Sequence, residues 1–97
     1  MSTNWIPQCP IPFAALEVFK QNGIEARATK GGRGLVLTDG ENYVSVYPVD
    51  DANTVLIERS GTNDPSAIVQ AIEDTFGIKL ISEYDPEYSE LAEQLLE

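Results

Sequence analysis

The chain has 97 residues, of which 42% are hydrophobic, and its 16 acidic and 6 basic residues give a net charge of −10. This size and composition are those of one globular domain that buries a core without disulfides. A strongly acidic protein is a poor ligand for nucleic acid, because phosphates have to be neutralised by cations. We therefore expect no direct nucleic-acid binding. A basic protein partner and simple solubility both explain the charge.

The sequence shows no sign of a membrane or secreted protein. No run approaches the ~18 apolar residues of a membrane span. The start, Met1 to Trp5, lacks the basic and apolar regions of a secretory signal. The single cysteine, Cys9, cannot form an internal disulfide and fits a reducing compartment. These features predict a cytoplasmic protein without membrane contact.

The chain contains no histidine, which removes the commonest general base and most types of zinc site. Two carboxylate pairs, Asp39 with Glu41 and Asp50 with Asp51, are candidates for acid–base or Mg²⁺ chemistry. Both pairs fall in expected turns, where aspartate is favoured because it hydrogen-bonds locally. We therefore predict no enzymatic activity, no metal and no cofactor.

A β-meander from Arg33 to Gly61 is the most strongly marked part of the sequence. Asp39-Gly40 lies between two β-favouring runs and predicts a two-residue type I′ turn. That turn pairs Leu37 with Asn42. Because side chains alternate across a strand, one face becomes aliphatic and is the expected core face. It collects Leu35, Leu37, Val44 and Val46.

A third strand, Thr54–Arg59, follows a turn at Asp50–Asn53. A four-residue loop pairs Val46 with Ile57, which places Leu56 on the face opposite the core with Val36, Tyr43 and Tyr47. An odd-length loop would instead turn Leu56 into the core. Pro48 cannot donate to a ladder and should lie at a strand end or a bulge.

The first third of the chain predicts a lead-in, a helix and a strand. Residues 1–11 carry two prolines and form an extended lead-in, which Trp5 and Ile6 dock onto the body. Pro12 begins a helix over Pro12–Asn22, and Gly23 supplies its left-handed C-terminal position. A strand follows over Ile24–Thr29.

The last third predicts two helices, each introduced by Asp-Pro. Asp64-Pro65 begins a helix with a core-facing stripe that includes Ile68, Ala71 and Ile72, and Gly77 ends it. A strand over Ile78–Tyr84 leads to Asp85-Pro86 and an acidic helix over 86–97. From Leu80 to the end there are six carboxylates and no basic residue.

Together these elements predict one α+β domain over 1–97, in the order α-β-β-β-β-α-β-α. We expect an antiparallel sheet of four to five strands with two helices packed on one face and an acidic C-terminal helix. The last helix has three candidate places, which are the sheet edge, the opposite face, or a partner.

The leading functional hypothesis is a non-enzymatic, acidic protein-binding module. It would act as a small inhibitor, an immunity-like protein or a nucleic-acid mimic that docks on a basic nucleic-acid-handling protein. The predicted contact residues are Val36, Tyr43, Tyr47, Leu56, Glu83, Asp85, Glu87, Glu90 and Glu93.

Two further hypotheses remain. A sensor of nucleotides or other anions would use the glycine-rich basic loop 30–34, with Lys20, Arg27, Lys30 and Arg33 as ligands. This loop lacks the P-loop and GxGxxG patterns, and a mobile hairpin loop whose charges offset the surplus of carboxylates is the favoured interpretation. The other hypothesis is a homodimer formed through the tyrosine face.

Overall fold

The computed structural model describes residues 3–29, 31–50, 53–58 and 64–96. In chain order the elements are β1 (Asn4–Pro7), α1 (Phe13–Glu17), β2 (Lys20–Gln21), β3 (Ile24–Ala28), β4 (Leu35–Thr38), β5 (Tyr43–Asp50), β6 (Asn53–Glu58), α2 (Ser66–Phe76), β7 (Leu80–Ser82) and α3 (Glu87–Leu96).

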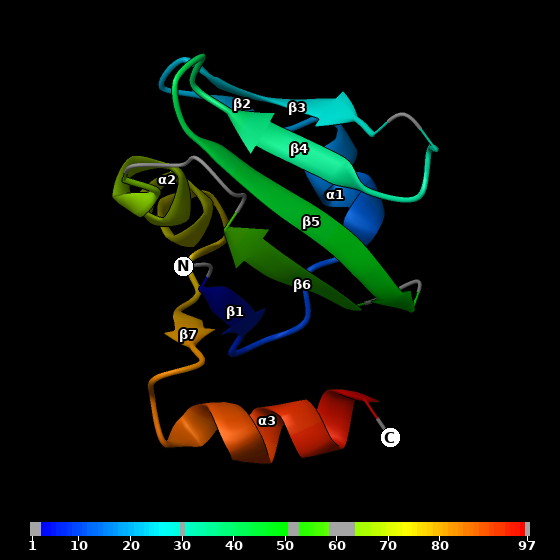
Figure 1. Cartoon of the computed structure of the whole chain (residues 1–97), viewed down its shortest axis with the longest axis vertical. Coiled ribbons are helices and arrows are strands. Elements are labelled where there is room, and N and C mark those ends of the chain that lie inside the picture. Colours follow the sequence, from blue (N-terminus) through cyan, green and yellow to red (C-terminus); the bar gives the residue numbers. More distant parts are fainter. Residues whose placement is uncertain (1–2, 30, 51–52, 59–63, 97) are drawn as a thin grey trace.

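In these described residues, seven strands form one antiparallel, strongly twisted sheet in the order β2-β3-β4-β5-β6-β1-β7 (Figure 1). The α+β class is confirmed, whereas the prediction of four to five strands and its element order are wrong. No helix in the described ranges is long and apolar enough to cross a membrane.

The core lies between one face of the sheet and helices α1 and α2. Leu16 of α1 and Ile68, Ala71 and Ile72 of α2 join a single cluster with the strand side chains. Burial of each large aliphatic side chain contributes about 1.5–3 kcal/mol. The predicted core face is confirmed, because Leu35, Leu37, Val44 and Val46 are buried. The two covering helices are confirmed by their side chains in the same cluster.

The β4–β5 hairpin has a four-residue loop, so the predicted two-residue turn is wrong. Leu37 pairs with Val44, not with Asn42. The Asp39 carboxylate accepts hydrogen bonds from the backbone N–H groups of Glu41 (2.9 Å) and Asn42 (2.8 Å), which stabilises the wider loop. The register moves by two residues, and an even shift leaves every side chain on its predicted face.

The β5–β6 register differs from the prediction by one residue. Val46 pairs with Leu56, because the ladder is irregular between Pro48 and Asp50. A bulge of this kind accepts a residue that cannot donate, and the prediction for Pro48 is confirmed. An odd shift exchanges the faces, so Leu56 is fully buried in the core while Val55 and Ile57 face the other way.

The N-terminal segment is an internal strand, not a lead-in. β1 pairs with both β6 and β7, placing Trp5 opposite Leu56 and Ile6 opposite Ile81. Trp5 therefore faces the core, and Ile6 faces the opposite side. Both are buried, as expected from their predicted docking. The prediction missed only the backbone pairing of this segment, which has a neighbouring strand on each side.

The predicted helix Pro12–Asn22 is wrong beyond Glu17. Lys20 and Gln21 form the edge strand β2, which pairs with β3 through a tight turn at Asn22-Gly23. The φ angles of Asn22 and Gly23 are 53° and 78°, and a type I′ hairpin turn requires positive values at both positions. Gly23 therefore lies in this hairpin turn, and the prediction that it ends a helix is wrong.

The second helix agrees with its prediction. Asp64 Oδ1 accepts a hydrogen bond from the Ser66 N–H (3.0 Å), and Gly77 ends α2 in the left-handed conformation. The following strand is shorter than predicted, because β7 covers only Leu80–Ser82.

Helix α3 packs against β1 and β7 at the edge of the sheet (Figure 1), so it occupies the first of its three candidate places and does not cover Tyr43 and Tyr47. There Ile6 and Ile81 are 2% and 1% exposed although they lie outside the main core cluster. Leu91 of α3 lines a small cavity together with Ile6, which shows that the helix covers this edge of the sheet.

The corrected register makes a direct prediction about stability. Replacement of buried Leu56 by alanine should lower the free energy of unfolding by about 2–5 kcal/mol. Val55→Ala, on the opposite face of the same strand, should cost about 1 kcal/mol or less. Urea denaturation of the two variants tests this, and equal losses would contradict the register.

Candidate protein-binding surface

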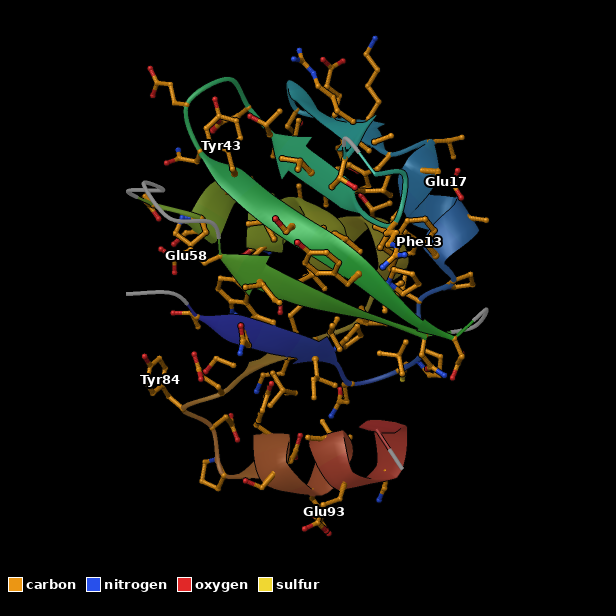
Figure 2. The ribbon with its side chains drawn as sticks, turned by 45° about the vertical axis from the view of Figure 1, so that its right-hand side comes forward. Phe13, Glu17, Tyr43, Glu58, Tyr84 and Glu93 are labelled. Carbon is orange, nitrogen blue, oxygen red and sulfur yellow. The ribbon has the colours of Figure 1, made fainter. Side chains whose placement is uncertain are left out.

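Part of the sheet opposite the core is left uncovered by the described helices. We call it the open face and define it by Val36, Tyr43, Ser45, Tyr47, Val55 and Ile57. The register aligns Val36, Ser45 and Ile57 across three strands, and Tyr47 lies opposite Val55. Tyr43 lies on this side of the sheet in Figure 2. The open face therefore combines aromatic, β-branched and hydroxyl side chains.

A shallow groove of about 480 Å³ runs over strands β3, β4 and β5 of the open face. It brings together Val36, Tyr43 and Tyr47 from the predicted protein-binding set. Arg27, which was predicted as an anion ligand, lines the same groove. Leu56 does not contribute, because it is buried on the other side of the sheet. The remaining lining residues are Ala28, Thr29, Thr38 and Ser45.

Gly34 allows the ring of Tyr47 to lie against the start of β4. A Cβ atom at Gly34 would be 2.8 Å from the Val46 carbonyl oxygen and 3.1 Å from two ring carbons of Tyr47. Contacts this short require the backbone or the ring to move. Gly34 belongs to the loop that was predicted to bind anions. Its role here is to make room for the Tyr47 ring, which the sequence did not reveal.

The predicted anion ligands do not form one cationic cluster. The Arg27 guanidinium pairs with the Glu25 carboxylate at 3.0 Å, with the two side chains 71% and 46% exposed. Lys20 lies opposite the same glutamate across the β2–β3 ladder. Arg33 is exposed in the turn before β4, and Lys30 lies outside the described residues. A carboxylate therefore pairs with one of the four cations.

The five predicted acidic contacts divide into two groups. Glu83 accepts a hydrogen bond from the Asn4 N–H of β1 (3.1 Å), and Asp85 accepts one from the Glu87 N–H at the start of α3 (2.9 Å). Glu87, Glu90 and Glu93 are exposed on the helix. Figure 2 shows Glu93 pointing away from the sheet.

Two tyrosines near α3 were not singled out from the sequence as contacts. Tyr84 is 70% exposed in the turn between β7 and α3 (Figure 2). Tyr88 is half-buried, and burial raises the pKa of its hydroxyl, with a further increase from the negative charge of Glu83. A hydrogen bond between Tyr88 and the Asn4 side chain opposes this rise and links α3 to β1.

No group of three or more His, Cys, Asp or Glu side chains that could hold a metal occurs in the described parts of the chain. Cys9 is exposed. Comparisons with protein-family models, with curated proteins and with solved structures gave no match. The functional argument therefore depends on the surface alone.

The close approach at Gly34 predicts a selective effect of an added methyl group. Gly34→Ala should destabilise the protein by about 1–3 kcal/mol and change the NMR shifts of the Tyr47 ring. Gly31→Ala is the matched control, because open space surrounds that position. If both variants leave the Tyr47 signals unchanged, the ring does not lie against Gly34.

The environment of Tyr88 predicts a pH effect. Its raised pKa means that the associated stability is fully present below the ordinary tyrosine pKa and is lost as pH rises through the folded-state pKa. Glu83→Gln keeps an acceptor for the Asn4 N–H but removes the charge, so the pKa of Tyr88 should fall. An NMR titration of the tyrosines measures it, and an unchanged pKa would contradict the contribution of Glu83.

Proposed function

We propose that this protein is a non-enzymatic, acidic protein-binding module that acts in the cytoplasm on a basic partner. A small inhibitor, an immunity-like protein or a nucleic-acid mimic for a nucleic-acid-handling protein fits this description. The observation that carries the proposal is the open face, whose tyrosines and β-branched side chains are exposed or half-buried on a protein that also carries exposed carboxylates on α3. Aromatic groups at the centre of an interface and charges at its rim are a common arrangement of binding surfaces.

The size of the open face sets a condition on the partner. Three strands at ~4.8 Å and about five residues at ~3.3 Å give roughly 240 Å². A stable interface usually buries about 800 Å² on each partner. The partner must therefore extend beyond the open face, and α3 is a further exposed surface of the protein. Its carboxylates would then steer the encounter and favour a cationic partner.

A second candidate function is the binding of a small anion or nucleotide. It is supported by one observation, the presence of Arg27 in the groove with Tyr43 and Tyr47. A ligand with an aromatic body and an anionic group would match these side chains. Thermal-shift measurements with nucleotides and inorganic phosphate test it, because a bound ligand raises the melting temperature.

The proposal predicts capture of a basic protein from a lysate of the source cells at low ionic strength. The complex should weaken as salt rises, because screening shortens the range of the carboxylate charges from ~10 Å at 0.1 M to ~3 Å at 1 M. Failure to recover any basic protein at low salt would contradict the proposal.

The same complex tests the open face. The double variant Tyr43→Ala/Tyr47→Ala should weaken binding at least tenfold, since aromatic anchors often contribute more than 1 kcal/mol each. Val18→Ala is the control, because Val18 is 82% exposed directly after α1, away from the open face. Equal affinities of the two variants would place the interface elsewhere.

A further inference from the structure

A second groove lies between helix α1 and the C-terminal end of strand β5, and it shares no lining residue with the groove on the open face. Its volume of about 600 Å³ is within the usual range of ligand sites, roughly 300–1,000 Å³. Figure 2 shows Phe13 and Glu17 on α1 at the side of β5. We call it the α1–β5 groove, and its lining residues are Phe13, Ala14, Glu17, Pro48, Val49 and Asp50.

We propose that the α1–β5 groove receives an arginine side chain of the basic partner. The methylene stem of the arginine lies on the apolar floor, and the guanidinium pairs with the carboxylates of Glu17 and Asp50. This inference rests on the proposed function for the existence of a basic partner. It adds a contact surface separate from the open face and names the type of residue that enters it.

The floor of the groove suits an arginine stem. Phe13 and Val49 are half-buried, whereas Ala14 and Pro48 are exposed. Phe13 also packs against the core cluster, which holds its ring in place. Long basic side chains bury their methylene groups along apolar surface of this kind and keep the charge in water. A guanidinium can in addition stack on an aromatic ring.

Each wall of the groove contributes one carboxylate. Phe13 and Glu17 are four residues apart on α1, so they share one side of the helix about 6 Å apart along its axis. On the other wall, the irregularity of β5 lies between Pro48 and Asp50. The Asn53 side-chain amide donates to both carboxylate oxygens of Asp50 at 3.0 Å. These contacts orient the carboxylate, and each oxygen retains a further acceptor site.

Charge selects a cation as the occupant. Among the residues that the structure describes, no basic side chain lines the α1–β5 groove. The groove on the open face differs, because Arg27 lines it. An acidic segment would meet two like charges here, and a second copy of this chain is disfavoured because each copy carries a net charge of −10.

The openness of the groove favours a side chain of a protein over a small free amine. All six lining residues are exposed or half-buried, so the groove is shallow. Sites for small ligands usually bury roughly 70–90% of the ligand surface. An arginine that belongs to a larger partner gains additional contacts from the surrounding surface of that partner.

A blocked amino acid tests the inference without knowledge of the partner. The probe is N-acetyl-arginine amide, and the control is N-acetyl-citrulline amide, which has the same shape with a neutral urea group in place of the guanidinium. In an NMR titration of the ¹⁵N-labelled protein at low salt, the arginine compound should shift the amide signals of Ala14, Glu17, Val49 and Asp50. The citrulline compound should bind about threefold to tenfold more weakly, because it loses two solvent-exposed ion pairs.

Variants locate the bound guanidinium. Glu17→Gln and Asp50→Asn should each raise Kd for the arginine compound by about twofold to fivefold. Phe13→Leu keeps an apolar side chain but removes the ring, and it should raise Kd by about twofold or more. Asp74→Asn is the matched control, because it removes the same charge from an exposed position on α2 that does not line the groove. Circular dichroism of each variant confirms that it is folded.

Two results would overturn the inference. One is equal binding of the arginine and citrulline compounds. The other is an equal Kd for the Glu17→Gln, Asp50→Asn and Asp74→Asn variants, because the probe would then respond only to the overall charge. Neither result decides the proposed function, which fails only if capture at low salt returns no basic protein. The groove inference and the general proposal can therefore fail separately.

Discussion

The packing of α1 and α2 against one face of the meander β4–β5–β6 is the constraint on which the other features depend. Side chains alternate along each strand, so burial of Leu37, Val44 and Leu56 beneath these helices determines which residues face the other way. As a consequence, the tyrosines of β5 and the β-branched residues of β6 lie on the opposite face. Helix α3 packs at the β1–β7 edge of the sheet and leaves the β4–β6 part of that second face open.

The sequence predicted the faces better than the registers, and the reason is the period of two. At the β4–β5 loop, capping by Asp39 moved the pairing by two residues and left the face of every side chain unchanged. At β5–β6, the irregularity after Pro48 moved it by one residue and transferred Leu56 to the core. The helix that begins at Asp64-Pro65 and the positions of the two turns in the meander were predicted correctly. Their signals lie in a few neighbouring residues.

Features that depend on distant contacts were not predictable from local patterns. Strand β1 pairs with β6 and β7, which lie more than 50 residues away, and nothing in its own residues indicates two partners. The contact of Gly34 with Tyr47 is another example. By contrast, Asn22-Gly23 is a recognised local hairpin signal. It was missed because the apolar residues before it favoured a helix. Of the candidate site, Val36, Tyr43 and Tyr47 were predicted together, while Val55, Ile57 and Tyr84 were not.

Solvent accessibility of the two faces of β5 and β6 is the most direct test of the account. A soluble gadolinium chelate broadens the NMR signals of side chains that water reaches. The account predicts strong broadening for Tyr47 and Val55, and protection of the methyl groups of Val44 and Leu56. Protection of Tyr47 and Val55 with broadening of Leu56 would contradict the assigned faces, and the proposed binding surface would have to be abandoned.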